Sequence, residues 1–128
     1  MEYFEAMDLH ELRFGKIILL SSNIAEVIIN DGIEMNEAMV NEYHEFLIAH
    51  LHAPFSLLIN KINSYSYDFA AQRNLATIKE IKAMAVVSYS RISVQATESL
   101  AAFPREVEWN INIFTNREAA LQWLVSEQ

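Results

Sequence analysis

The alternation of short apolar runs with longer amphipathic stretches constrains the fold of this chain more than any other feature. The runs "AEVIIN" (25–30), "FSLLIN" (55–60) and "KAMAVVSYS" (a strand around 83–89) have the length and composition of β-strands. The stretches between these runs have room for helices. Strands that alternate with helices predict a largely parallel sheet with right-handed crossover connections.

Two more runs complete the predicted sheet. "ELRFGKIILLSS" predicts a strand over residues 12–20, and too few residues separate it from 25–30 for a crossover, so the two should pair antiparallel. "EVEWNINIF" places Val107, Trp109 and Ile111 on one face and mostly polar residues on the other. That alternation predicts a half-exposed strand at an edge of the sheet.

Helical spacing and end signals define four helices. Asn36 is placed to cap the first, which runs to about Leu51 with Val40, Tyr43 and Leu47 on one stripe. The second helix is predicted to begin between Ser66 and Phe69 and to end at about Lys79, and the third lies between Ser93 and Phe103. The fourth is predicted to begin at a Thr115 cap, because Glu118 has capping-box spacing from it. Trp123 and Leu124 should dock this last helix on the sheet.

These elements predict the fold class. We expect one α/β domain over residues 1–128, with a five-stranded mixed β-sheet, four helices and the order ββαβαβαβα. The chain is long enough to bury a core of its own.

Charge and composition exclude several classes of function. The net charge of −8, with scattered basic residues, is unsuited to nucleic acid or to an anionic membrane surface. No apolar run approaches the roughly 20 residues that span a bilayer. The absence of cysteine and of a basic, apolar leader in "MEYFEAMDLHEL" predicts a cytoplasmic protein without thiolate metal sites.

The stretch "LINKINSYSYDFAA" (58–71) is the strongest candidate for a functional surface. It passes from a buried strand to the start of a helix, the position where parallel α/β sheets commonly bind ligands. Ser64 and Ser66 are candidate phosphorylation sites beside a helix N-terminus. The alternative is that Ser66 or Asp68 caps the helix and Ser64 lies in a turn.

The aromatic and polar residues of the same stretch are open to two interpretations. Tyr65 and Tyr67 are either exposed contact residues or fold inward over the end of the sheet. Lys61 and Asn63 either orient a ligand or solvate the loop, and Asp68 completes the set of candidate contact residues.

No catalytic or metal-binding pattern accompanies this stretch. The histidines His44, His50 and His52 lack the spacing and the carboxylate of a ligand set. Gly15 and Gly32 are isolated, so no phosphate-binding loop is predicted, and no serine lies in a nucleophile elbow. We therefore expect a protein without a metal, a cofactor or enzymatic activity.

Three stretches carry a resemblance to a known family: "FTNREAALQWL", "KAMAVVSYS" and "LLINKINSYSYDFAA". Together they resemble the SpoIIAA-like proteins, which are related to the STAS domain and overlap the label STAS/SEC14. The resemblance extends from about Leu12 to Leu124 and implies a SpoIIAA-like fold. In STAS proteins, a serine or threonine in the loop after the third strand is phosphorylated and controls partner binding; residues 63–68 match that loop without its Asp-Ser pair or following glycine.

The sequence and the resemblance together predict a non-enzymatic regulatory or protein-interaction domain that acts through this loop. The alternative is a binder of a small apolar molecule or lipid, which the SEC14 label suggests and which an apolar cavity of several hundred Å³ between a helix and the sheet would favour. Homodimerisation through an edge strand or an exposed helix face is also expected, since the strand 107–114 needs cover at its edge.

Overall fold

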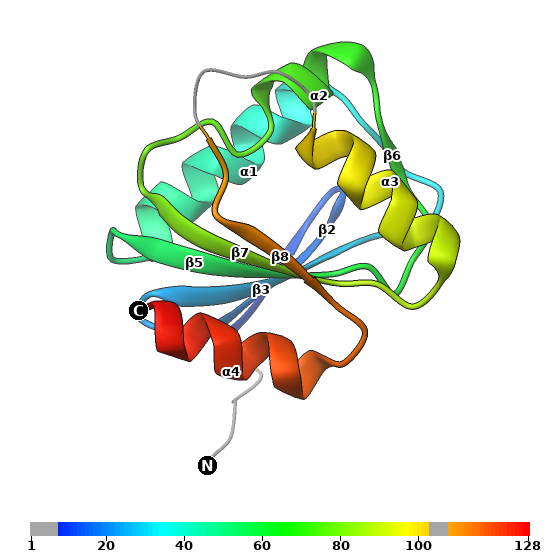
Figure 1. Ribbon diagram of the computed structural model, residues 1–128. Helices are drawn as coiled ribbons and strands as arrows, with labels where there is room; N and C mark the ends of the chain where they lie inside the picture. The colour runs from blue at the N-terminus through cyan, green and yellow to red at the C-terminus, as the bar shows by residue number, and fades with distance from the viewer. Residues whose placement is uncertain (1–7, 103–107) are drawn as a thin grey trace.

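A mixed β-sheet forms the centre of the structure, a computed structural model that describes residues 8–102 and 108–128 (Figure 1). Within these residues the sheet has six strands, not the predicted five. In spatial order they are β1 (Leu9–Leu12), β2 (Gly15–Ser21), β3 (Ile24–Ile29), β5 (Phe55–Asn60), β7 (Ile81–Val87) and β8 (Ile111–Phe114). The helices are α1 (Glu37–His50), α2 (Phe69–Asn74), α3 (Arg91–Ala101) and α4 (Arg117–Glu127).

The additional strand arises because the predicted strand over residues 12–20 is part of a hairpin. Leu12 pairs with Gly15, so the chain reverses at Arg13 and Phe14, neither of which is a typical turn residue. Phe14 is fully buried and Arg13 forms an ion pair of 2.6 Å with Glu42 of α1. Tertiary contacts therefore hold a turn that the local sequence does not predict.

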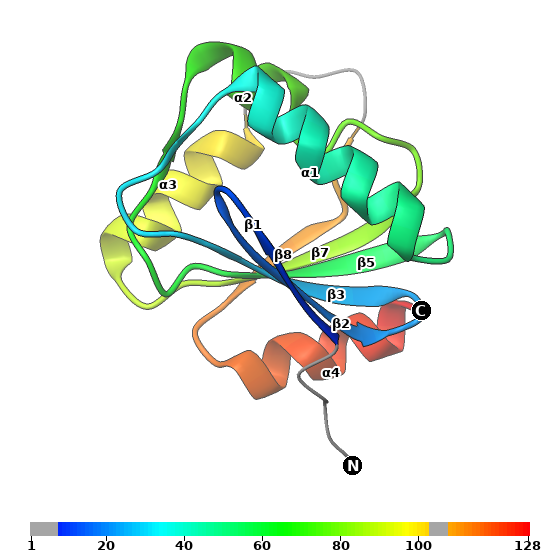
Figure 2. The same ribbon diagram turned by 180° about the vertical axis from the view of Figure 1, so that it is seen from behind.

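The remaining strands are parallel, and their order places the helices. β3, β5, β7 and β8 follow one another in space as they do along the chain. Right-handed crossovers between successive strands then put α1, α2 and α3 on one face, while α4 covers the other (Figures 1 and 2). The prediction of an α/β fold with a mixed sheet and four helices is confirmed for the described residues.

The two faces of the sheet bury two separate apolar clusters. The larger one lies under the helices of the first face and includes Val40, Tyr43 and Leu47 of α1. The smaller one lies under α4, where Leu124 is fully buried and Trp123 is partly buried against the same cluster. The predicted docking of the last helix through these two residues is confirmed.

A second, two-stranded sheet links the segment before α1 to the segment before α2. β4 (Glu34–Met35) pairs in parallel with β6 (Ser66–Tyr67). Sequence reasoning did not predict this sheet because strands of two residues are too short to show a period. Its consequence is that the amides of Ser66 and Asp68 are held by backbone hydrogen bonds to the carbonyls of Ile33 and Met35.

The helix ends agree with the sequence in some places and correct it in others. Asn36 caps α1 as predicted, by accepting a hydrogen bond from the amide of Met39. The N-cap of α4 is Asn116, whose side chain accepts from the amide of Ala119 at 2.9 Å, so the predicted Thr115 cap is wrong.

The ends of α2 and α3 also differ from the prediction, the first because of tertiary contacts and the second because of a local cap. α2 stops at Asn74 rather than about Lys79 because Ala76 adopts a left-handed φ of 55°. The N–H of Ala76 donates to Nε2 of His44 and its carbonyl accepts from the indole of Trp109. α3 begins at Arg91, earlier than predicted, because Ser90 caps it.

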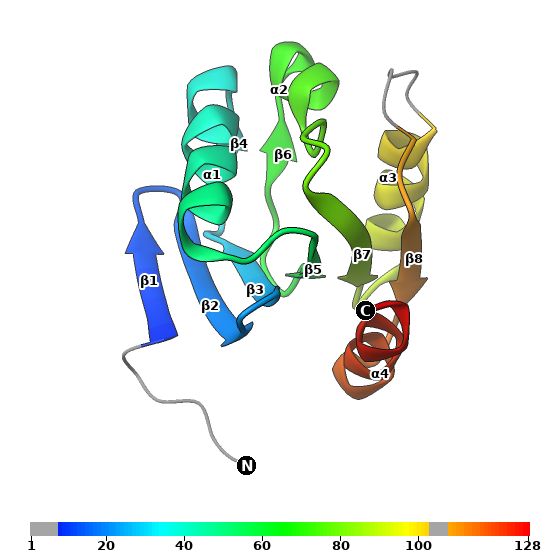
Figure 3. The ribbon, with the colours of Figure 1, turned by 90° about the vertical axis from the view of Figure 1, so that its left-hand side faces the viewer.

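The last strand lies at an edge of the sheet, as predicted (Figure 3). Within the described residues it extends only over Ile111–Phe114, and the predicted position of Val107 falls among residues 103–107, outside them. Among the described helices, none combines the length and the apolar character needed to cross a membrane.

Candidate functional site

A groove of about 290 Å³ lies between the loop after β5 and the start of α3. β5 and β7 are parallel neighbours, with Asn60 opposite Val87, so the loops that follow them leave the sheet at the same edge (Figure 1). We call this hollow the loop groove. It is lined by Lys61, Ile62, Asn63, Ser64, Tyr65, Tyr89, Ser90, Ile92, Ser93 and Ala96.

The first wall of the loop groove is fixed by hydrogen bonds to the segment after β3. The side chain of Asn63 donates to the carbonyl of Ile29, and the amide of Ser64 donates to the carboxylate of Asp31, both at 2.9 Å. The carbonyl of Ser64 accepts from the amide of Gly32 at 2.7 Å. Because backbone and side chains both contribute, the loop holds one shape without a helix or long strand of its own.

The second wall is fixed by three serine side chains. Ser90 accepts a hydrogen bond from the amide of Ser93 and so caps α3. The hydroxyl of Ser93 donates to that of Ser88, which is fully buried at the end of β7. The first turn of α3 is thereby anchored to the sheet.

The two tyrosines that follow β5 point inward. The rings of Tyr65 and Tyr67 make an edge contact with centroids 5.6 Å apart, and the hydroxyl of Tyr67 donates to that of Tyr65 at 3.4 Å. Both rings pack against the larger cluster, near Tyr43. Burial raises the pKa of Tyr67 to about 12 and the pKa of Tyr65 well above its usual value. Of the two interpretations of these residues, the inward one therefore describes the structure.

The rim of the loop groove carries three of the exposed large apolar side chains. Ile62, Tyr89 and Ile92 are 63%, 53% and 79% exposed, respectively. They come from both walls, Ile62 from the loop after β5 and the others from the start of α3. A cluster of exposed apolar side chains around a hollow is typical of a contact surface for another molecule.

Lys61 is the cation of the loop groove. Its backbone amide donates to the carbonyl of Val87, which continues the pairing of β5 with β7, and its ammonium lies 5.5 Å from the centre of the Tyr65 ring. The side chain forms no ion pair with any carboxylate of the described residues. Burial lowers the pKa of Lys61, since a partly desolvated ammonium is disfavoured.

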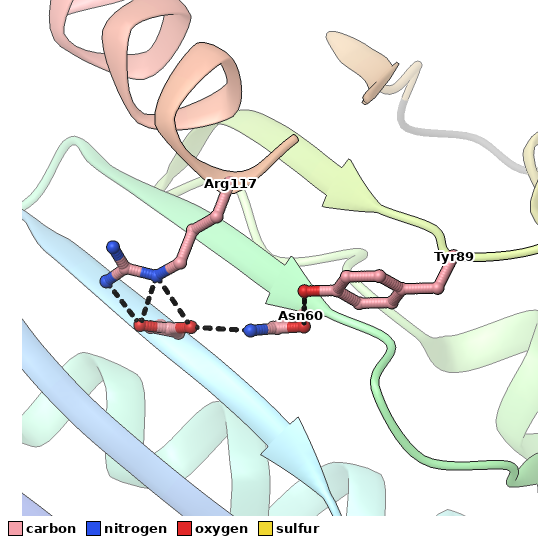
Figure 4. A network of polar contacts seen from close by, with 4 residues as sticks. Asn60, Tyr89 and Arg117 are labelled. Carbon is pink, nitrogen blue, oxygen red and sulfur yellow. Dashed lines mark hydrogen bonds and ion pairs between the residues drawn. The ribbon is translucent and has the colours of Figure 1, made fainter. Parts of the chain in front are cut away.

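A polar network joins the loop groove to the opposite face of the sheet (Figure 4). The hydroxyl of Tyr89 donates to the amide oxygen of Asn60 at 2.8 Å, and the amide nitrogen of Asn60 donates to the carboxylate of Glu26 at 2.9 Å. Arg117 of α4 completes the network with an ion pair of 2.7 Å to Glu26, which is buried. This carboxylate raises the pKa of Arg117. The network thus sets the position of the Tyr89 ring at the rim.

The structure divides the predicted site residues into two groups. Lys61, Asn63, Ser64 and Tyr65 line the loop groove. Ser66, Tyr67 and Asp68 do not: the backbone of Ser66 pairs with β4, and Asp68 caps α2 by accepting from the amide of Ala71 at 2.8 Å.

Sequence reasoning missed the second wall. Tyr89, Ser90 and Ile92 lie in "SYSRIS", directly after the strand that neighbours β5. A signal was available, because adjacent parallel strands end at the same edge and their loops should meet there.

One cavity under the helices is too small for a ligand. A cavity of about 30 Å³ lies between the sheet and the helices of the first face, lined by residues that include Tyr43, Tyr67, Ala76 and Trp109. That volume suits about one water molecule, whereas small-molecule sites occupy about 300–1,000 Å³. In the part of the chain that the structure describes, no group of three or more histidine, aspartate or glutamate side chains is arranged to hold a metal ion.

Comparisons with family models, with curated proteins and with solved structures found no match to this chain. The resemblance to SpoIIAA-like proteins therefore stays a prediction.

Proposed function

We propose that this protein is a non-enzymatic interaction domain and that the loop groove is its contact surface. The observation that carries the proposal is the exposure of Ile62, Tyr89 and Ile92 around one hollow. Exposed apolar side chains on a contiguous surface cost solubility, and burying them against a partner recovers the hydrophobic free energy. The walls are held rigidly, which lowers the entropic cost of binding.

The loop groove suits a protein partner better than an apolar small molecule or lipid. Its lining mixes the polar side chains of Asn63, Ser64 and Ser90 with the apolar rim. The internal cavity of about 30 Å³ gives a lipid chain no room. A short segment of a partner protein matches this lining. Its apolar side chains would cover the rim, and its backbone would lie beside the serine side chains.

The resemblance to STAS proteins adds a regulatory element to the proposal. Ser64 and Ser66 are both exposed, and neither hydroxyl makes a hydrogen bond within the described residues. Ser64 also lines the loop groove. A phosphate there would add about −1.5 to −2 charges to the contact surface and change which partners fit.

The test is a comparison of two substitutions on the full-length chain. Ile92→Asp places a charge at the rim, whereas Val125→Asp places the same charge at a similarly exposed position of α4 on the other face. Tagged wild-type protein and both variants are used to purify bound proteins from native cells, with quantitative mass spectrometry. We expect one partner to be retained by wild type and by Val125→Asp and lost with Ile92→Asp.

A partner that binds all three proteins equally would place the contact surface elsewhere. Circular dichroism and a urea denaturation curve of each variant provide the folding control, because both substitutions are at exposed positions and should leave stability within about 0.5 kcal/mol.

A further inference from the structure

We propose that the loop groove binds an acidic segment of a partner protein, in which a carboxylate is flanked by an aliphatic side chain. The carboxylate would meet Lys61 and the aliphatic side chain would cover Ile62 or Ile92. This inference rests on the proposed function and adds the chemistry of the partner.

The first support is the local charge of the loop groove. The whole chain has 17 acidic and 9 basic residues, so an average surface of this protein repels carboxylates. The lining of the loop groove has the reverse balance, because it contains Lys61 and no aspartate or glutamate. Asp31 is adjacent, but its carboxylate binds the amide of Ser64 and is not part of the lining. The loop groove is thus a locally positive place on an acidic protein.

The second support is the state of Lys61. Its ammonium is partly withdrawn from water and has an aromatic ring as its neighbour instead of a carboxylate. A desolvated cation without a counter-ion is unfavourable, so a carboxylate that reaches it gains more than it would at a fully hydrated lysine. The start of α3 at the same hollow also favours negative charge, because the first-turn amides lie at the positive end of the helix dipole.

The third support is the composition of the rim, which limits how the acidic segment is built. A ligand with charge alone would leave the exposed Ile62 and Ile92 uncovered. A hollow of about 290 Å³ holds a few side chains rather than a folded domain. Nucleic acid would satisfy Lys61, but its phosphates would be repelled by the surrounding surface at a net charge of −8. An acidic, partly aliphatic peptide segment satisfies both requirements.

The experiment uses a random-peptide phage library selected on the full-length chain, followed by affinity measurements on the enriched peptides. Four variants are compared with wild type: Lys61→Met, Lys61→Arg, Lys79→Met and Ile92→Asp. Lys79 is exposed and lies beyond the amino end of β7, so Lys79→Met gives the same charge change away from the loop groove. We expect enriched peptides to pair Asp or Glu with Leu, Ile or Val.

Lys61→Met should weaken the binding of these peptides about tenfold or more, while Lys61→Arg and Lys79→Met leave it within about twofold. Replacing the acidic residue of the peptide by its amide should weaken binding to wild type by a similar factor and have little effect on Lys61→Met, which identifies the pair.

Two other outcomes separate this inference from the proposed function. In the first outcome, the enriched peptides lack acidic residues, and their affinity is unchanged by Lys61→Met but lost with Ile92→Asp. This outcome would overturn the inference of an acidic segment and would still support the loop groove as the contact surface. In the second outcome, the selection yields no peptide whose binding is weakened by Ile92→Asp. This outcome would count against the acidic segment and against the proposed contact surface.

Discussion

The two walls of the loop groove both carry tyrosines, yet they use them in opposite ways. In the first wall and in β6, which follows it, Tyr65 and Tyr67 turn inward and pack on the larger apolar cluster. In the second wall, Tyr89 remains 53% exposed and its hydroxyl is bound by Asn60. The same residue type therefore stabilises the fold on one side of the loop groove and remains exposed on the other, where we propose the contact surface.

The direction of each tyrosine follows from the element that holds it. Tyr67 belongs to β6, whose pairing with β4 turns the side chain toward the helices of the first face. Tyr89 follows β7 without a second pairing, and a polar network from the other face, through Asn60 and Glu26, holds its tip. A difference in backbone support, and not in sequence composition, decides which tyrosines are exposed. The following four predictions test this comparison.

The largest difference is expected from truncation of one inward tyrosine, Tyr67, and of the exposed tyrosine of the second wall, Tyr89. Tyr67→Ala removes a ring that packs on the core and should lower the free energy of unfolding by about 3 kcal/mol. Tyr89→Ala removes a ring that is half exposed and should lower it by about 1 kcal/mol or less. Urea denaturation of both variants measures the effect, and equal losses would contradict the division between the walls.

A second prediction concerns pH and the layer beneath the first wall. Burial lowers the pKa of His44 from 6.5 to about 4 in the folded protein. Above pH 6.5 the imidazole is neutral in both the folded and the unfolded protein. Below pH 6.5 the unfolded chain takes up the proton first, so the free energy of unfolding falls. The titration of His44 should therefore lower the free energy of unfolding by about 2 kcal/mol between pH 7 and pH 5.

The control for this titration is His44→Gln, which cannot take up the proton. The pH dependence of its unfolding should be shallower than that of wild type by the same amount. The affinity of the folded protein for peptides should not depend on the protonation of His44, because this residue lies outside the loop groove.

The third prediction tests the support of the second wall. Arg117→Met leaves the buried carboxylate of Glu26 without its ion pair and should lower the free energy of unfolding by about 2 kcal/mol. Glu26→Gln with Arg117→Met should recover part of that loss, since no buried charge remains. A double-mutant cycle by urea denaturation gives the coupling, and additive effects would show that the pair contributes nothing.

The smallest effect is expected from Tyr89→Phe. This change removes only the hydrogen bond to Asn60 and should lower the free energy of unfolding by about 0.5 kcal/mol, less than Tyr89→Ala. If the network positions the ring for a partner, the same change should reduce peptide affinity, which fluorescence anisotropy can measure. An affinity equal to that of wild type would show that the hydroxyl contributes to the fold alone.

The parts of the fold that were predicted from sequence are those with periodic or local signals. The buried runs 25–30 and 55–60 lie within a residue of β3 and β5, and Asn36 caps α1 as expected. The hairpin at Arg13 and Phe14 was not predicted, because buried contacts and an ion pair hold its turn in place of turn residues. The end of α2 depends on His44 and Trp109, which are distant in sequence from Ala76.

The site was predicted in part for a similar reason. Position along the chain indicated residues 61–68 as the candidate surface, because they follow a parallel strand, and residues 61–65 of that stretch line the loop groove. The orientation of Tyr65 and Tyr67 depends on the pairing of β4 with β6, which no local pattern reveals. Ile62 and Ile92 are apolar residues whose exposure becomes visible only when both loops are placed in space.

The small sheet of β4 and β6 has a consequence for how this surface can change. The amides of Ser66 and Asp68 donate to the carbonyls of Ile33 and Met35, so the course of the loop depends on main-chain atoms that every residue type except proline provides. The exposed side chains at positions 62, 64 and 66 can then be exchanged without redirecting the backbone. A randomised library at these positions would let one scaffold acquire new binding preferences, much as the hypervariable loops of an antibody do on a constant framework.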